Sequence, residues 1–128
     1  MSDKTLHVEL VAADRLVWSG EATSISARTA AGDIGILPDH APVLSVLHGG
    51  VVEIHAVGGD TVRAAVSDGF LSVAHNRISI LSDRADLATH IDRAEAQSRL
   101  DELQAATDAD PAELRLATGR VEVAAKGS

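Results

Sequence analysis

The chain has 128 residues, a formal net charge of −8 at pH 7 and no cysteine, which excludes disulfide and thiolate chemistry. Hydrophobic residues make up 45% of the chain but aromatic residues only 2%, so we expect one domain with an aliphatic core and no surface for stacking bases. The acidic charge disfavours nucleic acid and anionic lipid as direct partners. Because no apolar run approaches the ~20 residues of a membrane span and residues 1–5 lack a signal-peptide core, we expect no direct membrane insertion.

The first 30 residues alternate between apolar and polar side chains, which is typical of strands with one buried face. The first of these strands is predicted to bury Leu6, Val8, Leu10 and Ala12. A turn at residues 13–14 leads to a short strand with Leu16 and Trp18, which we expect to end at Gly20. Residues 23–29 alternate again and predict another strand.

Residues 32–50 are too irregular for one regular element. Glycines at both ends permit unusual backbone angles, and Pro38 and Pro42 fix φ and remove two N–H donors. Between the prolines lie Asp39 and His40, with aliphatic anchors on both sides. A rigid loop with a polar tip is a candidate partner surface. The alternative is a proline-stiffened corner of a β-domain.

From Gly49 onward the alternation returns and is interrupted by turn signals. Val52, Ile54 and Ala56 are predicted to share one face of a strand. The residues at 58–60 and 68–69 are typical of hairpin turns, and a further turn is predicted at 75–76. Short strands at this spacing indicate an antiparallel sandwich or barrel.

The periodicity becomes helical near residue 90. Asp92 and Glu95 form a capping-box pattern, and Asp110-Pro111 predicts the start of a second helix. The expected apolar stripes are Ala96, Leu100 and Leu103 on the first helix and Leu114, Ala117, Val121 and Ala124 on the second, which Gly119 weakens. Helices this short are marginal alone, so we expect an αα-hairpin that docks on the sandwich or on another subunit and is able to detach.

The residue types do not point to catalysis. The six histidines include no close pair, and neither a nucleophile elbow nor a phosphate-binding loop is present. We therefore expect no metal and no cofactor. Two alternatives stay open: a small metalloenzyme of the cupin type using His40, His48 and His55, and a sandwich that binds carbohydrate or peptide, for which aromatic anchors are scarce.

The stretch Gly-Asp-Ile-Gly-Ile-Leu-Pro-Asp-His-Ala-Pro-Val-Leu closely resembles the signature loop of the epsilon subunit of F-type ATP synthase. The resemblance continues through residues 49–54, returns at residues 67–73 and covers roughly residues 4–96 well. It selects the sandwich over the barrel. We therefore expect an N-terminal antiparallel β-sandwich over residues 1–86 and a C-terminal αα-hairpin over residues 87–128.

The resemblance implies a non-catalytic rotor subunit of the central stalk, which joins the gamma subunit to the c ring and couples proton flow to ATP synthesis. It places Asp33, with Gly32 beside it, near the polar loops of the c ring, and His40 near the same contact; the alternative for Asp33 is an ordinary turn residue. Ala12 and Ser45 correspond to the gamma-facing surface of the family. The expected location is the cytoplasmic face of the bacterial plasma membrane, as a peripheral part of the F1 sector.

The C-terminal hairpin departs from the family. Several bacterial members bind ATP at a motif that Ile91, Asp92 and Ala96 match here, but Glu95 stands where the family has arginine. A carboxylate repels phosphate, so we expect weak ATP binding or none. The second helix carries three cations, Arg115, Arg120 and Lys126, and we therefore do not expect the extended inhibition of ATP hydrolysis seen in longer members. A shorter regulatory contact with the alpha and beta subunits stays open.

Overall fold

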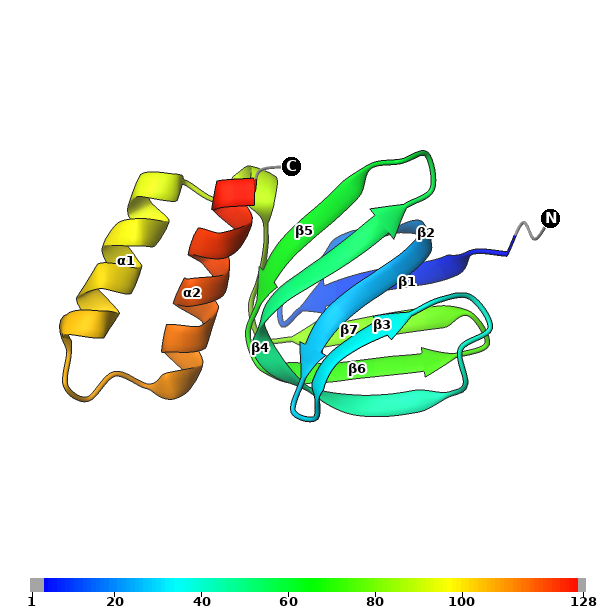
Figure 1. Cartoon of the computed structure of the whole chain (residues 1–128), viewed down its shortest axis with the longest axis horizontal. Coiled ribbons are helices and arrows are strands. Elements are labelled where there is room, and N and C mark those ends of the chain that lie inside the picture. The colour runs from blue at the N-terminus through cyan, green and yellow to red at the C-terminus, as the bar shows by residue number, and fades with distance from the viewer. Residues whose placement is uncertain (1–3, 127–128) are drawn as a thin grey trace.

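The computed structural model describes residues 4–126, which form a β-domain followed by two helices (Figure 1). The strands are β1 (Leu6–Ala12), β2 (Arg15–Thr29), β3 (Gly32–Ile36), β4 (Val43–Ala56), β5 (Thr61–Val66), β6 (Gly69–Ala74), β7 (Arg77–Ser82) and β8 (Ala85–Leu87). A short 3-10 turn, η1 (Ala88–His90), leads to α1 (Arg93–Ala105) and α2 (Pro111–Lys126). The predicted fold class, a β-sandwich with a C-terminal pair of helices, is confirmed.

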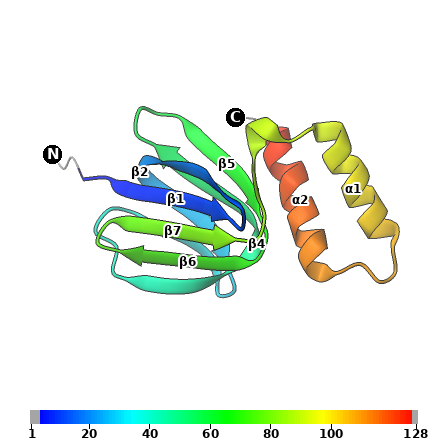
Figure 2. The same ribbon diagram turned by 180° about the vertical axis from the view of Figure 1, so that it is seen from behind.

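The strands follow the order β3-β2-β1-β7-β6-β4-β5-β8, and an additional pairing between β2 and β4 folds the sheet over on itself. Every pairing is antiparallel except that of β1 with β7, which run parallel side by side (Figure 2). The expectation of antiparallel pairing therefore has one exception. The exception arises because β1 and β7 are far apart in the chain, so no hairpin turn dictates their relative direction.

The core between the layers is aliphatic, as the composition predicts. The predicted alternation of β1 is confirmed, since its seven residues alternate between buried and half-buried. The largest fully buried side chains are Leu6, Leu10, Ile25, Ile36, Leu47, Ile54, Leu71, Ile78 and Ile80. Of the two aromatic residues, Trp18 packs against the edge of this core and Phe70 is 53% exposed. Phe70 is thus left available for another role.

Two strands are longer than the glycines in them suggest. β2 continues through Gly20, where a Cβ atom would lie 2.8 Å from the Trp18 ring, so the glycine makes room for the indole. β4 continues through Gly49 and Gly50: residues 43–47 pair with β6 and residues 50–55 with β5. The region 32–50 is therefore β3, a loop at residues 37–42 and the first half of β4, instead of one irregular stretch.

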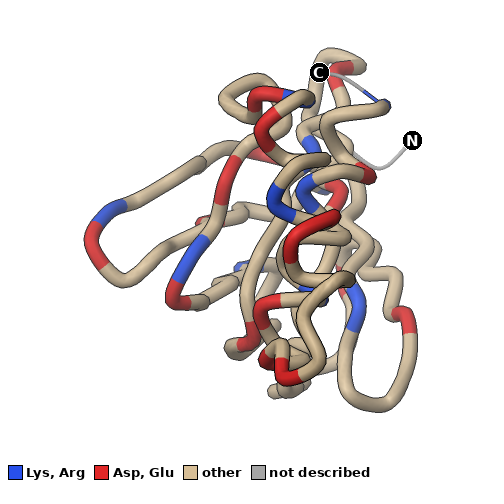
Figure 3. Tube along the Cα trace, turned by 90° about the vertical axis from the view of Figure 1, so that its left-hand side faces the viewer, with Lys and Arg blue, Asp and Glu red and all other residues tan. Residues whose placement is uncertain are grey.

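Both helices begin where the sequence predicts. The Asp92 carboxylate accepts a hydrogen bond from the Glu95 N–H at 3.1 Å, and the Asp110 carboxylate accepts one from the Ala112 N–H at 2.9 Å. These caps satisfy N–H groups that have no partner within the first helical turn. Acidic and basic positions are interspersed along the two helices, as seen from the helix side of the molecule (Figure 3).

α2 lies between α1 and the sandwich and therefore needs two apolar faces (Figures 1 and 2). Of the predicted stripe, Leu114, Ala117 and Val121 pack with Leu100 and Leu103 of α1, whereas Ala124 belongs to the cluster on the sandwich side. A second face, which the sequence analysis missed, buries Leu116 and Val123 in a cluster with Ala65 of β5 and Ile91. Two independent faces explain why the apolar pattern of α2 is broader than one stripe.

Candidate functional site

A row of apolar side chains crosses one outer face of the sandwich. Cross-strand pairing joins its members in the order Leu16 (β2), Val11 (β1), Leu81 (β7), Phe70 (β6) and Val46 (β4). Four of them are between 47% and 54% exposed, and Val11 is half-buried. Side chains in register on neighbouring strands lie side by side, so the five form one continuous strip, which we call the apolar row.

The residues next to the apolar row are mostly small or apolar. Leu44, which is 72% exposed, lies two residues before Val46 and so on the same face of β4. The adjacent set of cross-strand partners runs Ser19, Glu9, Ser79 and Ser72, so it carries three serines and one carboxylate. A contiguous patch of exposed apolar side chains is typical of a surface that binds another protein.

The two residues predicted to face gamma lie beside this surface but point away from it. Ala12 is 4% exposed, and Ser45 is half-buried opposite the fully buried Leu71. Successive side chains of a strand point to opposite faces, so their neighbours Val11 and Val46 are the ones that face outward. The apolar row could have been found in the sequence. In strands whose residues alternate between inward and outward positions, it consists of large apolar residues at outward positions.

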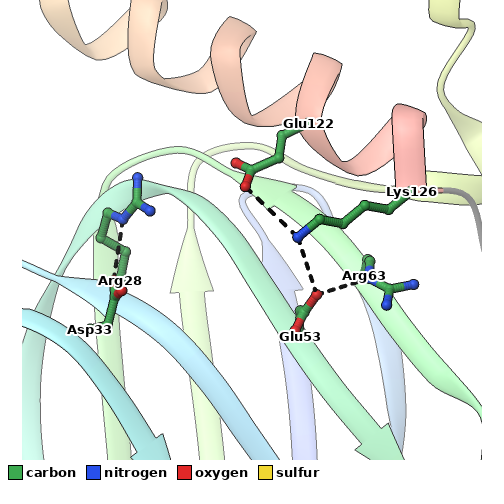
Figure 4. Close-up of polar contacts among 6 residues, drawn as sticks. All are labelled: Arg28, Asp33, Glu53, Arg63, Glu122 and Lys126. Carbon is green, nitrogen blue, oxygen red and sulfur yellow. Dashed lines mark hydrogen bonds and ion pairs between the residues drawn. The ribbon is translucent and has the colours of Figure 1, made fainter.

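Asp33 lies at the start of β3, next to the tight turn that joins β2 to β3. Its carboxylate accepts a hydrogen bond from Arg28 Nε at 3.3 Å, and its side chain remains 78% exposed (Figure 4). The turn is closed by Thr29, whose hydroxyl donates to the Gly32 carbonyl at 2.7 Å, and Gly32 adopts a φ of 119°. The turn therefore needs glycine at this position and presents the neighbouring carboxylate to solvent.

The loop at residues 37–42 is tied to the turn between β6 and β7. The Asp39 N–H donates to Asn76 Oδ1 at 2.6 Å, and Asn76 Nδ2 donates back to Asp39 at 3.2 Å. Lys4 Nζ donates to the same carboxylate at 2.8 Å, and Lys4 and then Asn76 hold the pKa of Asp39 below its ordinary value. His40 donates from Nδ1 to the Ala41 carbonyl at 2.6 Å. These bonds hold the polar tip in one conformation.

The predicted c-ring residues lie along one free edge of the sheet. β3 is the last strand in the sheet order and pairs on one side only, with β2. Gly32 and Asp33 stand at its start, whereas His40 follows its end, so about 13 Å of extended chain separates Asp33 from the loop. The structure thus brings Gly32 and Asp33 together and places His40 at the opposite end of the same edge.

Each cation of α2 forms an ion pair with the sandwich. The pairs are Arg115 with Asp68 at 2.8 Å, Arg120 with Asp86 at 3.3 Å and Lys126 with Glu53 at 3.8 Å. All three pairs span the contact between α2 and the strands or the segments that join them. The docked hairpin therefore uses every positive charge that α2 carries.

Two of these carboxylates carry additional hydrogen bonds from the sandwich. Partial burial alone would raise the pKa of Asp68, but the Gly49 N–H at 2.6 Å and the Arg115 guanidinium together lower it below its ordinary value. Arg63 Nε donates to Glu53 at 2.8 Å and lowers the pKa of Glu53, and Lys126 adds to this effect (Figure 4). Both groups therefore favour the ionised form that the docked helix needs.

A hollow of about 270 Å³ is lined by residues of both helices and by Arg84; of the four positions compared with the nucleotide motif, only Glu95 lines it. Its wall carries Glu95, which lies 3.8 Å from Arg120, so the carboxylate neutralises a cation of the second helix. Arg99, also in the wall, lies 3.4 Å from Glu102 and 3.7 Å from Glu113. Guanidinium groups that are already paired with carboxylates attract a phosphate poorly.

Comparison with known proteins settles the family. The family model for the β-sandwich domain of the ATP synthase delta/epsilon chain matches residues 5–88. The chain belongs to the epsilon family of ATP synthase subunits. A protein called ATP synthase epsilon chain from Streptomyces griseus is 51% identical over 120 residues, which are 94% of this chain and 95% of that one. Another of the same name from Nocardia farcinica is 46% identical over 121 residues, covering 94% and 90%.

Solved structures of distant relatives share the fold of this epsilon-family chain. A chain in the mitochondrial ATP synthase of Euglena gracilis superposes with a TM-score of 0.73 at 23% identity, over 94% of this chain and 80% of that one. A chain from the central stalk and c ring of the Tetrahymena thermophila enzyme gives 0.61 at 20% identity, over 98% of both. The sandwich and the helices both lie within the shared fold.

The histidines of this family member do not converge. His48 and His55 are seven residues apart on β4, which corresponds to roughly 20 Å of strand, and His40 lies in the loop before it. Within residues 4–126, no group of three or more side chains of the metal-binding types is arranged to hold a metal ion. In the same part of the chain, no helix combines the length and the apolar character of a membrane span.

Proposed function

We propose that this chain is a non-catalytic subunit of the rotor that joins gamma to the c ring, at the cytoplasmic face of the bacterial plasma membrane, and so couples proton flow to ATP synthesis. Membership of the epsilon family supports the proposal that the chain is part of an ATP synthase complex. The observation that carries the gamma contact is the apolar row, since a strip of exposed aliphatic and aromatic side chains over five strands is unfavourable in water.

The apolar row has the dimensions of an interface core. Five neighbouring strands span four spacings of about 4.8 Å, which is roughly 19 Å. Burial of its half-exposed side chains, together with Leu44 and the flanking serines, is consistent with the ~800 Å² that each partner contributes to a stable interface. We propose Val11, Val46, Phe70 and Leu81 as gamma contacts, in place of the inward-pointing Ala12 and Ser45.

The test of this assignment is co-purification with the cognate gamma subunit. Size-exclusion chromatography with mass determination should give a one-to-one complex at moderate salt, because the contact is mainly apolar and salt screens it little. Failure of two folded partners to associate under any salt condition would refute the gamma contact.

For the c ring, we propose contact along the free edge of β3, from Gly32 and Asp33 to His40. The exposed Asp33 carboxylate is suited to charge-assisted hydrogen bonds with basic or amide groups of polar loops. Replacement of Asp33 by Asn should lower proton-driven ATP synthesis in reconstituted vesicles while the gamma complex still forms. Asp60→Asn, in the turn between β4 and β5, is the matched control and should leave synthesis unchanged.

We also propose that the hairpin neither binds ATP tightly nor blocks ATP hydrolysis. Pairing of Glu95 with Arg120 and use of all three α2 cations in the docked state support both statements. Isothermal titration should detect no micromolar ATP affinity, and such an affinity would contradict the first statement. Deletion of residues 91–128 should leave hydrolysis by the reconstituted enzyme unchanged, whereas a clear rise would contradict the second.

A further inference from the structure

A hollow lies beside the three central members of the apolar row. An open hollow of about 390 Å³, equivalent to about a dozen water molecules at roughly 30 Å³ each, is lined by Val11, Phe70 and Leu81. The chain segments that complete its wall carry two carboxylates, Asp68 and Asp83. The hollow therefore combines an apolar lining with negative charge, and it is continuous with the proposed gamma surface.

The two carboxylates differ in the number of hydrogen bonds that they already accept. Asp68 accepts hydrogen bonds from the Gly49 N–H and from Arg115, one on each oxygen, and each oxygen can accept another. Asp83 is exposed, and its carboxylate has no hydrogen bond or ion pair with any residue between 4 and 126. Arg84, the next residue, lines the adjoining hollows and not this one.

A partner that covered the apolar row with apolar groups alone would take Asp83 out of water without compensation. Removing a carboxylate from water is costly unless a cation replaces the lost hydration. No lysine or arginine of residues 4–126 lines this hollow: Arg115 reaches Asp68 from the α2 side, and Arg15 and Arg84 line the adjoining hollow that shares Asp83. A cation that enters this hollow must therefore come from the partner.

On the basis of the proposed gamma contact, we infer that the hollow receives a lysine or arginine side chain of the gamma subunit. Its aliphatic stem lies along Phe70 and Leu81, and its charged end lies between Asp83 and Asp68. Long basic side chains bury their methylene groups in this way while keeping the charge near polar groups. The net charge of −8 further favours a basic partner surface.

The test is the affinity of the full chain for gamma, measured by isothermal titration at low and at high salt. Asp83→Asn should weaken binding about tenfold at low salt and flatten the salt dependence, because it removes one member of an ion pair. Asp60→Asn, also an exposed turn carboxylate but outside this face, is the matched control and should match the wild type at both salt concentrations. Thermal unfolding checks that both variants are folded.

The outcomes separate this inference from the proposed function. If wild-type chain binds gamma and Asp83→Asn binds with the same affinity and salt dependence, the hollow does not hold a cation and the inference is wrong. If the wild-type chain does not bind gamma at all, the gamma contact itself is refuted, and this inference with it. If Asp83→Asn loses affinity for gamma while Asp60→Asn does not, the result supports both the gamma contact and the cation in the hollow.

Discussion

Gly119 of α2 packs directly on the backbone of Gly50 in β4. A Cβ atom at Gly119 would lie 2.9 Å from the Gly50 carbonyl oxygen, a distance that Cβ atoms essentially never show in proteins, and 3.2 Å from the Gly50 Cα atom. The glycine that weakens the apolar stripe in the sequence is thus a point of close contact between the helix and the sheet. It links the C-terminal hairpin to the strand that also carries Val46.

Replacement of Gly119 by Ala should therefore loosen the docked hairpin. In an exposed helix the same change would stabilise the chain by roughly 1 kcal/mol. Here the backbone must shift, and we expect a net loss of about 1–3 kcal/mol in the free energy of unfolding. Urea unfolding and hydrogen exchange of the α2 amides measure it. Gly35→Ala, where a Cβ atom meets nothing within 4 Å, is the control; equal effects of the two variants would contradict the close packing.

The Asp68 ion pair should make hairpin docking sensitive to acid. Because the pKa of Asp68 is lowered in the folded protein, its contribution to stability is present above about pH 4, the ordinary value, and is lost as the pH falls through the folded pKa. Asp68→Asn should therefore be less stable than wild type at neutral pH, and the difference should narrow below about pH 4. A constant difference in unfolding free energy across this range would contradict the ionised pair.

The loop at residues 37–42 should lose its fixed conformation when Asn76 is replaced. Asn76 has a φ of 61°, so Asn76→Gly keeps the turn but removes both hydrogen bonds to Asp39. We expect faster hydrogen exchange at the Asp39 amide and little change in global stability. His75→Gly is the matched control, since His75 has a φ of 51° and does not bond to the loop. Unchanged hydrogen exchange at the Asp39 amide in Asn76→Gly would show that the two hydrogen bonds from Asn76 are not needed to fix the loop.

The sequence predicted most local features well because short-range rules decide them. The hairpin predicted at residues 68–69 is wrong, since β5 and β6, which these residues join, both pair with β4 and not with each other. The alternation of β1, the turns at residues 58–60 and 75–76 and the caps at Asp92 and Asp110 all depend on residues within a few positions of one another. The parallel pairing of β1 with β7 was not predicted, because it joins segments about 70 residues apart. The second apolar face of α2 was missed for the same reason.

The candidate site could be predicted only in part. The family loop located Gly32 and Asp33 on an exposed turn, but the residues carried over for gamma conflict with the alternation of their own strands. Ala12 follows the buried series of Leu6, Val8 and Leu10 and is itself buried. A residue that is carried over by its position in a family motif brings no information on the direction of its side chain. The alternation of buried and outward residues along the strand gives that direction, and on β1 it selects Val11 instead of Ala12.

Phe70 and its neighbour Leu71 should separate binding from stability. Phe70 is 53% exposed, so Phe70→Ala should cost less than about 1 kcal/mol of unfolding free energy. Leu71 is fully buried, and Leu71→Ala should cost about 2–5 kcal/mol because it leaves a cavity. Thermal and urea unfolding of the isolated chain measure both. A large loss with Phe70→Ala would indicate that its ring serves the fold instead of a partner.

The measurement that tests the account most directly is the affinity for gamma of Phe70→Ser compared with Val57→Ser. Val57 is equally exposed, at 52%, but lies beside the turn between β4 and β5 and outside the apolar row. If gamma docks on the apolar row, Phe70→Ser weakens the one-to-one complex at least tenfold, because an aromatic side chain buried in the interface is lost, while Val57→Ser binds as the wild type does. Equal affinities for the two folded variants would show that gamma does not dock on the apolar row.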